Sequence, residues 1–99
     1  MCYDEYMKTN KTKTAKQFER HFKGVANHRR IAILLLVSKN PGIVLEEISE
    51  NLDCNLKTIS EHTRRLVQAG LLNKVYKGRK VEHRISPYGK IFCDFIRRF

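Results

Sequence analysis

The chain has 99 residues, of which 41% are hydrophobic and 30% are charged. This length and composition predict one globular domain rather than a disordered chain. No apolar run approaches the roughly 20 residues that span a membrane, and the charged N-terminus lacks the form of a secretion signal, so we expect a cytoplasmic protein with no membrane partner. The net charge is +10, and residues 1–30 and 57–99 are basic whereas residues 31–56 are acidic. This distribution favours a polyanionic partner.

The cysteines are odd in number and widely spaced, so we expect reduced thiols at Cys2, Cys54 and Cys93. Neither these cysteines nor the four histidines have the spacing of a zinc site, and we expect no metal and no cofactor. No pair of carboxylates, Ser-His-Asp set or glycine-rich phosphate loop stands out, so the chain is not expected to be an enzyme.

The N-terminal end is polar, and residues 1–13 are expected to form a flexible arm before a single domain over residues 14–99. Thr14 is expected to cap a first helix that runs to about Phe22 and carries one apolar stripe. Gly24 is expected to break this helix.

A second helix is predicted over residues 29–38, with Asn27 as its N-cap. This helix is apolar around most of its circumference and should lie at the centre of the core. A turn at residues 39–42 ends it, and residues 43–44 follow as a very short strand. Residues 45–52 predict a third helix, which has two glutamates in its first turn, where the helix dipole favours them.

A fourth helix is predicted over residues 56–69, after a tight turn that has Asp53 in the left-handed conformation and Asn55 as the N-cap. Gly70 ends it. Its outward face carries side chains of the types that bind phosphates and base edges. The candidate DNA-binding residues of this helix are Lys57, Thr58, Ser60, Glu61, His62, Arg64 and Arg65.

Two β-prone runs, residues 71–76 and 80–86, flank a short connection that contains a glycine, and they predict a hairpin. Its tip is a cationic finger that can reach a DNA backbone or a minor groove. The candidate DNA-binding residues here are Lys77, Arg79 and Lys80. Pro87 then begins a last helix, whose apolar stripe runs to the final residue.

Helix, short turn, helix, glycine and hairpin, in this order, predict an α+β, mostly α fold: a winged helix-turn-helix with about five helices and a two-stranded β-wing. In such a fold the second helix of the pair enters the major groove. Taken with the basic charge, this order predicts a sequence-specific DNA-binding transcriptional regulator whose partner is double-stranded DNA.

The stretch from Asn27 to Gly89 resembles the ArsR-type winged helix-turn-helix regulators of bacteria and archaea. The resemblance rests on His-Arg-Arg-Ile-Ala-Ile-Leu at residues 28–34, Thr-Ile-Ser-x-His at 58–62, Ala-Gly-Leu-Leu at 69–72 and Lys-Gly-Arg at 77–79. It implies a homodimer built on the terminal helices, repression of an operator, and a nucleoid-associated protein in the cytoplasm. MarR-like and TrmB-like domains share much of this pattern, and the branch stays open.

Metal-sensing members of that family carry a Cys-x-Cys pair near the third helix or Asp and His ligands on the last one. This chain has no thiol over residues 43–47, and its last helix offers only Cys93 and Asp94, so metal sensing is not expected. Cys54 is expected to be a buried plug in the turn. Cys93 is expected on the flank of the last apolar stripe, where a dimer could bring two thiols together, so redox sensing stays open as a minor alternative.

The terminal helices carry more apolar surface than a thin core covers, and they predict a homodimer formed through the first and last helices. The expected interface residues are Phe18, Phe22, Tyr88, Ile91, Phe92, Phe95 and Phe99. In the alternative interpretation both helices complete the core of a monomer.

A second functional hypothesis is a winged-helix protein–protein interaction module in a larger assembly. The acidic third helix, with Glu46, Glu47 and Glu50, keeps this hypothesis open. The basic residues of the fourth helix argue against it, because they suit DNA better than a protein partner.

Overall fold

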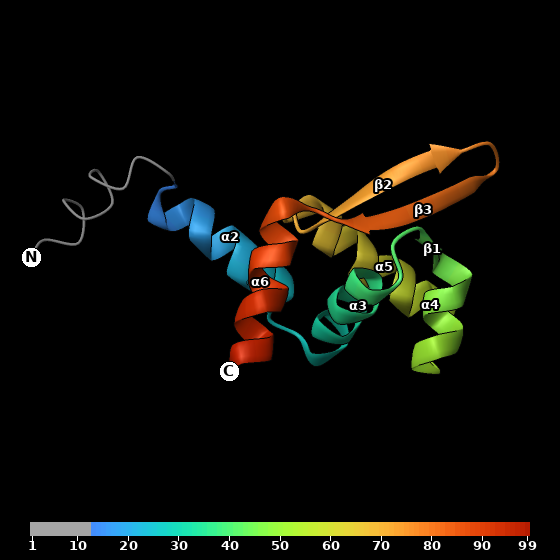
Figure 1. The fold of residues 1–99 in the computed structure, drawn as a ribbon, viewed down its shortest axis with the longest axis horizontal. Helices are drawn as coiled ribbons and strands as arrows, with labels where there is room; N and C mark the ends of the chain where they lie inside the picture. Colours follow the sequence, from blue (N-terminus) through green and yellow to red (C-terminus); the bar gives the residue numbers. More distant parts are fainter. Residues whose placement is uncertain (1–12) are drawn as a thin grey trace, which may run out of the picture.

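The computed structural model describes residues 13–99, which form five helices and a three-stranded sheet (Figure 1). The predicted α+β, mostly helical class is confirmed. The expected arm lies outside the described residues, apart from Lys13, and so does Cys2. In chain order the elements are α2 (Ala15–Val25), α3 (His28–Lys39), β1 (Ile43–Val44), α4 (Leu45–Leu52), α5 (Leu56–Gln68), β2 (Leu72–Lys77), β3 (Lys80–Ile85) and α6 (Pro87–Arg98).

Polar side chains cap the starts of α2, α3, α5 and α6. Thr14 and Gln17 form a reciprocal capping box at the start of α2. The side-chain oxygens of Asn27, Asn55 and Ser86 accept N–H groups from the first turns of α3, α5 and α6 at 2.9, 2.7 and 3.0 Å. Each such cap typically contributes about 1 kcal/mol to helix stability, which is why the helices begin at these residues.

The prediction that Gly24 breaks the first helix is wrong, because α2 continues to Val25. Gly24 lies where α2 crosses α5, and a Cβ atom at this position would overlap with the Cβ atom of Ala69. The glycine therefore permits close approach of two helices rather than a reversal of the chain. This crossing fixes α2 against the C-terminal end of α5.

The tight turn before α5 has the predicted form. Asp53 has a φ of +48°, in the left-handed region, and ends α4. Cys54 is half-buried rather than fully buried, and its Sγ atom accepts a hydrogen bond from Arg29 Nη1 at 2.6 Å. The turn holds α4 and α5 in contact, as in a helix-turn-helix pair.

The sheet is antiparallel and has the strand order β1-β3-β2. The two predicted strands of the hairpin are confirmed, and β1 adds a third by pairing Ile43 with His83. Gly78 has a φ of +62°, which suits the first central position of a two-residue hairpin connection. The hairpin projects from the helical body, as Figure 1 shows.

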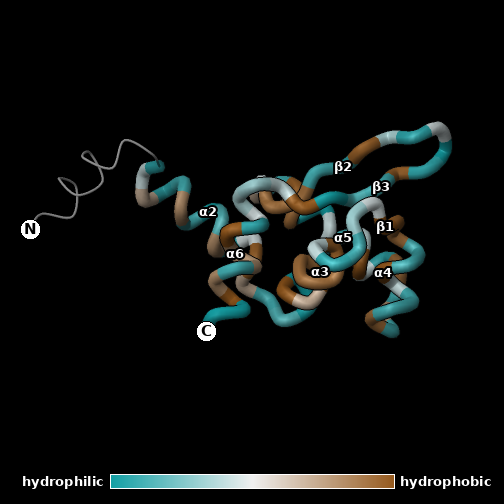
Figure 2. Tube along the Cα trace, in the orientation of Figure 1, coloured by the Kyte–Doolittle hydropathy of each residue, from teal (hydrophilic) through white to brown (hydrophobic). Residues whose placement is uncertain are grey.

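One hydrophobic core joins the helices to the base of the hairpin. Figure 2 shows hydrophobic residues along α3 and at the base of the hairpin. Helix α3 lies at its centre, as predicted, with three fully buried residues. The largest fully buried apolar side chains are Ile33, Leu34, Val37, Ile48, Ile59, Leu66, Leu71 and Leu72.

Cys93 also belongs to the core, with an exposed fraction of 0%. The expectation that it lies on the flank of the α6 stripe is therefore wrong. Burial raises the pKa of the Cys93 thiol, with a lesser opposing effect from Ser38. Since this thiol faces the inside of the protomer, it cannot meet a second copy across the outer face of α6, and the redox alternative loses its basis.

Candidate nucleic-acid interface

Helix α5 has one buried face and one charged face in contact with solvent. Ile59, Thr63 and Leu66 are buried, and they lie one above the other on the side that faces the core. The 3.6-residue repeat places Lys57, Glu61 and Arg64 on the opposite side, where all three are exposed. The predicted recognition helix therefore presents its charged residues outward.

The two arginines at the middle of α5 share one acidic partner. Glu61 Oε1 accepts from Arg64 Nη2 at 2.6 Å and from Arg65 Nε at 3.1 Å. These bonds lower the pKa of the Glu61 carboxyl, with the Arg64 bond the larger cause. All three side chains stay about half exposed, so the ion pairs are weak and the arginines can exchange Glu61 for a phosphate.

His62 lies on the side of α5 that faces α3, and it is half-buried. Its Nδ1 atom accepts a hydrogen bond from Arg30 Nε at 3.1 Å, because a guanidinium can only donate. Burial, followed by the charges of Arg30 and Arg29, lowers the pKa of His62. The imidazole is therefore neutral near pH 7 and keeps its Nε2–H as a donor.

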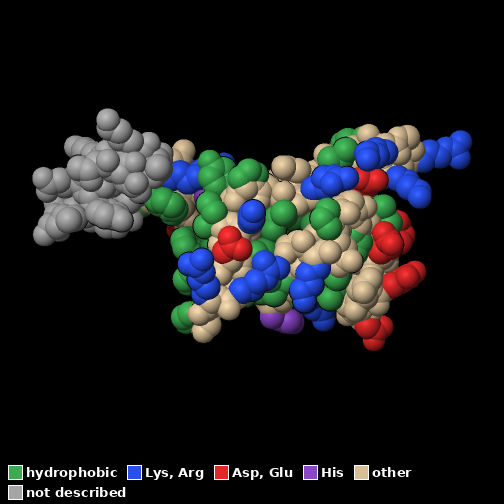
Figure 3. All heavy atoms as spheres, in the orientation of Figure 1, with side chains coloured by type: hydrophobic (Ala, Val, Ile, Leu, Met, Phe, Trp, Pro, Cys, Tyr) green, Lys and Arg blue, Asp and Glu red, His purple; other side chains and the backbone are tan. Residues whose placement is uncertain are grey.

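The tip of the hairpin is basic and exposed. Lys77 lies 3.6 Å from Glu82, an ion pair on the side of the hairpin. Arg79 and Lys80 are exposed and make no ion pair within residues 13–99. Figure 3 shows Lys and Arg side chains at the projecting end of the molecule. The hairpin therefore projects the positive charges of Arg79 and Lys80 away from the core.

The ten predicted DNA-binding residues fall into two groups that the fold brings to neighbouring elements. Seven are on α5 and three are at the hairpin tip. Within the first group, Ser60 is on the side of the helix that faces the hairpin, and Thr58 is half-buried toward the other side. No predicted residue of this set is buried.

The acidic residues of α4 gather at one end of the molecule. Glu46 and Glu47 are in its first turn, and Glu50 follows on the same helix; all three are exposed. Figure 3 shows this acidic surface beside the basic hairpin. The acidic charge predicted for residues 31–56 and the basic charge predicted for residues 57–99 therefore lie on separate surfaces of the folded chain.

An apolar groove of about 440 Å³ runs between α2 and α6. Phe22, Ile91 and Phe95 are more than half exposed in it. Six of the seven predicted interface residues line the groove, and the seventh, Phe99, is fully exposed and stacks on Phe95 with 5.7 Å between ring centroids. Phe92 also packs against the core, but the exposed side chains of this set do not, so the surplus of apolar surface predicted for the terminal helices is real.

Three residues that the sequence analysis missed shape these surfaces. Arg30 joins three helices, because it donates to His62 and also to the backbone oxygens of Lys23 and Gly24. No spacing rule reveals such a contact. Lys74 and Tyr76 share a strand face with the buried Leu72, and strict alternation along residues 72–76 could have identified them.

No helix among residues 13–99 is long and apolar enough to cross a membrane. The same residues hold no group of three His, Cys, Asp or Glu side chains that could bind a metal ion.

Comparison with known proteins relates this geometry to a family. Residues 27–73 match the model of a family described as winged helix-turn-helix DNA-binding. No curated protein sequence matches the chain.

Several solved structures share the fold. Reduced HlyU from Vibrio cholerae is 24% identical, with 95% of each chain covered and a TM-score of 0.78. The homodimeric winged helix-turn-helix DNA-binding domain of a possible ArsR-family transcriptional regulator from Mycobacterium bovis is 26% identical, with 83% of this chain and 76% of that chain covered and a TM-score of 0.76. The transcriptional regulator HlyU from Vibrio vulnificus is 18% identical, with 98% and 97% covered and a TM-score of 0.77.

The match covers the helix-turn-helix pair and reaches the first wing strand, and the similar structures extend over the remaining helices. The chain therefore has the winged helix fold, its residues 27–73 match a winged helix-turn-helix DNA-binding family, and its predicted resemblance to ArsR-type regulators is confirmed.

Proposed function

We propose that this protein is a homodimeric, sequence-specific DNA-binding transcriptional regulator that acts as a repressor at the nucleoid. In this proposal residues 14–99 form a single domain, and the protein is not an enzyme. The observation that carries it is the exposed face of α5, with Lys57, Arg64 and Arg65. Next to it lies a hairpin whose tip residues Arg79 and Lys80 make no ion pair within residues 13–99.

In the proposed complex α5 lies in the major groove, and the hairpin tip contacts the backbone or the adjacent minor groove. Arg64 and Arg65 suit guanine edges or phosphates, and Thr58 and Ser60 suit phosphates near the start of the helix. His62 offers its Nε2–H as a donor, since Arg30 occupies Nδ1. When the arginines turn to the DNA, the Glu61 carboxylate is available to accept a hydrogen bond from the amino group of cytosine.

The proposed dimer forms through the apolar groove between α2 and α6. A second copy that contributes the same groove would cover Phe22, Ile91 and Phe95, which are otherwise costly to expose. The homodimeric state of the similar Mycobacterium bovis domain supports this arrangement. Such a dimer would present two α5 helices about one DNA turn, roughly 34 Å, apart to a near-palindromic site.

Selection of genomic fragments with the purified protein, followed by fluorescence anisotropy on the recovered sequence, tests this proposal. We expect tight, salt-sensitive binding to a palindromic site, and at least a tenfold loss of affinity in Arg64→Ala with an unchanged melting temperature. Recovery of no shared sequence, together with no binding even in dilute buffer, would refute it.

The alternative function is a protein–protein interaction module, and the exposed acidic surface of α4 is the observation that favours it. The two functions differ in the surface that they use. Substitution of Glu46, Glu47 and Glu50 by Gln should leave DNA binding intact or strengthen it, because these charges repel phosphate. A wild type that binds no DNA but binds a protein partner, and a variant that loses this partner, would favour the alternative.

A further inference from the structure

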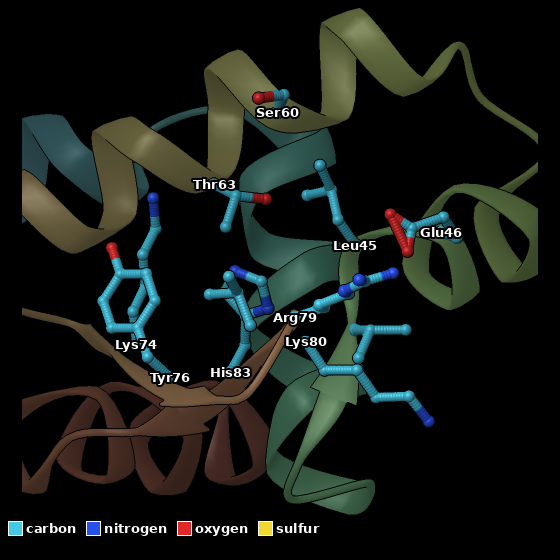
Figure 4. Close-up of a pocket in the computed structure, with 11 residues that line it drawn as sticks. Leu45, Glu46, Ser60, Thr63, Lys74, Tyr76, Arg79, Lys80 and His83 are labelled. Carbon is cyan, nitrogen blue, oxygen red and sulfur yellow. The ribbon is translucent and has the colours of Figure 1, made fainter.

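A pocket of about 300 Å³ lies under the hairpin, between α5 and the start of α4 (Figure 4). It exists because the hairpin extends beyond the helical body. At its base, Leu72 pairs with Ile85 and packs on the core. The next two pairs on the same face, Lys74 with His83 and Tyr76 with Val81, face α5 across a gap. We call this space the wing pocket.

The polar side chains of the wing pocket converge on one space. Figure 4 shows Lys74, Tyr76 and His83 pointing from the sheet toward α5, and Thr63 pointing from α5 toward the sheet. Residues from three separate segments therefore meet here, which is the arrangement expected of a binding site rather than of a solvated strand face.

Thr63 has a hydroxyl group without a partner. The residue is 1% exposed, and its Oγ1 atom makes no hydrogen bond. Buried hydroxyls are nearly always paired, because they lose their bonds to water on folding. Since Thr63 lines the wing pocket, an oxygen atom of a ligand in the pocket would accept a hydrogen bond from its hydroxyl group.

The charges around the wing pocket favour an anion. Lys74, Arg79 and Lys80 line it, against one carboxylate, Glu46. His83 is neutral near pH 7, because burial lowers its pKa and Lys74 adds to this effect, while the bond to the Ile43 carbonyl and Glu46 oppose it. The lining thus carries a surplus of positive charge next to an unpaired hydroxyl.

Apart from Ser60, the rest of the lining is apolar. Val44, Leu45 and Val81 form part of the wall, and the ring of Tyr76 covers another part. An inorganic ion would leave this wall in contact with water, whereas a ligand with a small hydrocarbon body would cover it. The volume is at the lower end of the range for small-molecule sites, so the body must be small.

We propose that the wing pocket binds a small organic anion, with its charged group toward Lys74 and the Thr63 hydroxyl and its apolar body against Leu45 and Val81. The bound anion neutralises cations that otherwise meet DNA, so it lowers the affinity for DNA. This coupling rests on the proposed function; the binding of the anion does not.

Titration of the isotope-labelled full chain with benzoate, followed by amide chemical shifts, tests the proposal, with chloride at equal ionic strength as the reference. We expect saturable shifts at Leu45, Thr63 and His83. Thr63→Val keeps the shape of the side chain and should weaken binding about tenfold, because it removes a hydrogen bond to a charged group. Lys74→Gln should also weaken it, and Lys90→Gln, which removes an exposed charge on α6, should not.

Inorganic phosphate, as a second probe, separates a free organic anion from a phosphate of the DNA backbone. Benzoate should bind more tightly than phosphate and should lower DNA affinity in the wild type but not in Thr63→Val. The absence of saturable shifts, equal binding of phosphate and benzoate, or an unchanged response in both Thr63→Val and Lys74→Gln would overturn the proposal. A wild type that binds benzoate but no DNA would refute the proposed function and leave the anion site standing.

Discussion

Arg79 gives the sharpest quantitative test of the proposed DNA complex. It is one of the two residues that connect β2 to β3, it is exposed, and it makes no ion pair within residues 13–99. The neighbouring Gly78 has open space around it, so the connection between the strands is not packed at this position. Arg79→Gln should therefore leave the folded state intact and remove only one cation from the surface of each protomer.

The expected effect follows from counterion release. Each phosphate that a cation neutralises adds about 0.9 to the slope of log K against log salt concentration. A dimer carries two copies of Arg79, so the variant should have a slope smaller by about 1.8. Between about 50 and 200 mM salt, this difference means that the variant loses roughly tenfold less affinity than the wild type.

Fluorescence anisotropy with a labelled duplex, repeated over a series of salt concentrations, measures the slope. Lys90→Gln, an exposed lysine on α6, is the matched control and should keep the slope of the wild type. An unchanged slope in Arg79→Gln would show that the hairpin tip does not touch phosphate. A change of about 0.9 would show that only one tip is engaged, against the two-fold arrangement.

Three further predictions concern the rest of the structure. Gly24→Ala should lower the free energy of unfolding by about 1–2 kcal/mol in urea denaturation, because overlap with Ala69 outweighs a gain of about 1 kcal/mol in helix propensity. Ala69→Gly in the same chain should restore the free energy of unfolding. The absence of this rescue would disprove the close crossing of α2 and α5. The lowered pKa of His62 means that the neutral form is favoured in the folded state, so stability should be complete above the ordinary value of 6.5 and should fall as the pH drops through the lowered pKa. His62→Gln should flatten this dependence between about pH 5 and pH 8, and an equally steep curve would contradict the lowered pKa of His62. Phe95→Glu should give the mass of one 11.7 kDa chain in light scattering where the wild type gives two, and an unchanged dimer mass would remove the α2–α6 groove from the interface.

Local sequence signals predicted the elements because their causes are local. Asn27 and Asn55 cap the helices that follow them, Asp53 adopts the left-handed conformation, and the glycine of the hairpin connection has a positive φ. The exposure of the α5 face also follows from a local cause, since the 3.6-residue period of Ile59, Thr63 and Leu66 fixes which side is buried.

Features that depend on distant contacts could not be predicted in this way. Gly24 looked like a helix breaker because its partner, Ala69, is 45 positions further along the chain. Cys93 looked like a flanking residue because the sequence does not show how α6 turns against α3. The wing pocket depends on how far the hairpin extends past α5, and this distance is set by packing at Leu72 rather than by any motif.

Chemical-shift mapping of the isotope-labelled protein with its selected duplex tests the central claim most directly. The account predicts that the largest changes fall on the amides of α5 around Lys57 and Arg64 and on the hairpin tip around Arg79, with small changes on the acidic helix α4. Changes confined to α4 or to the α2–α6 groove, with α5 unaffected at saturating duplex, would contradict it.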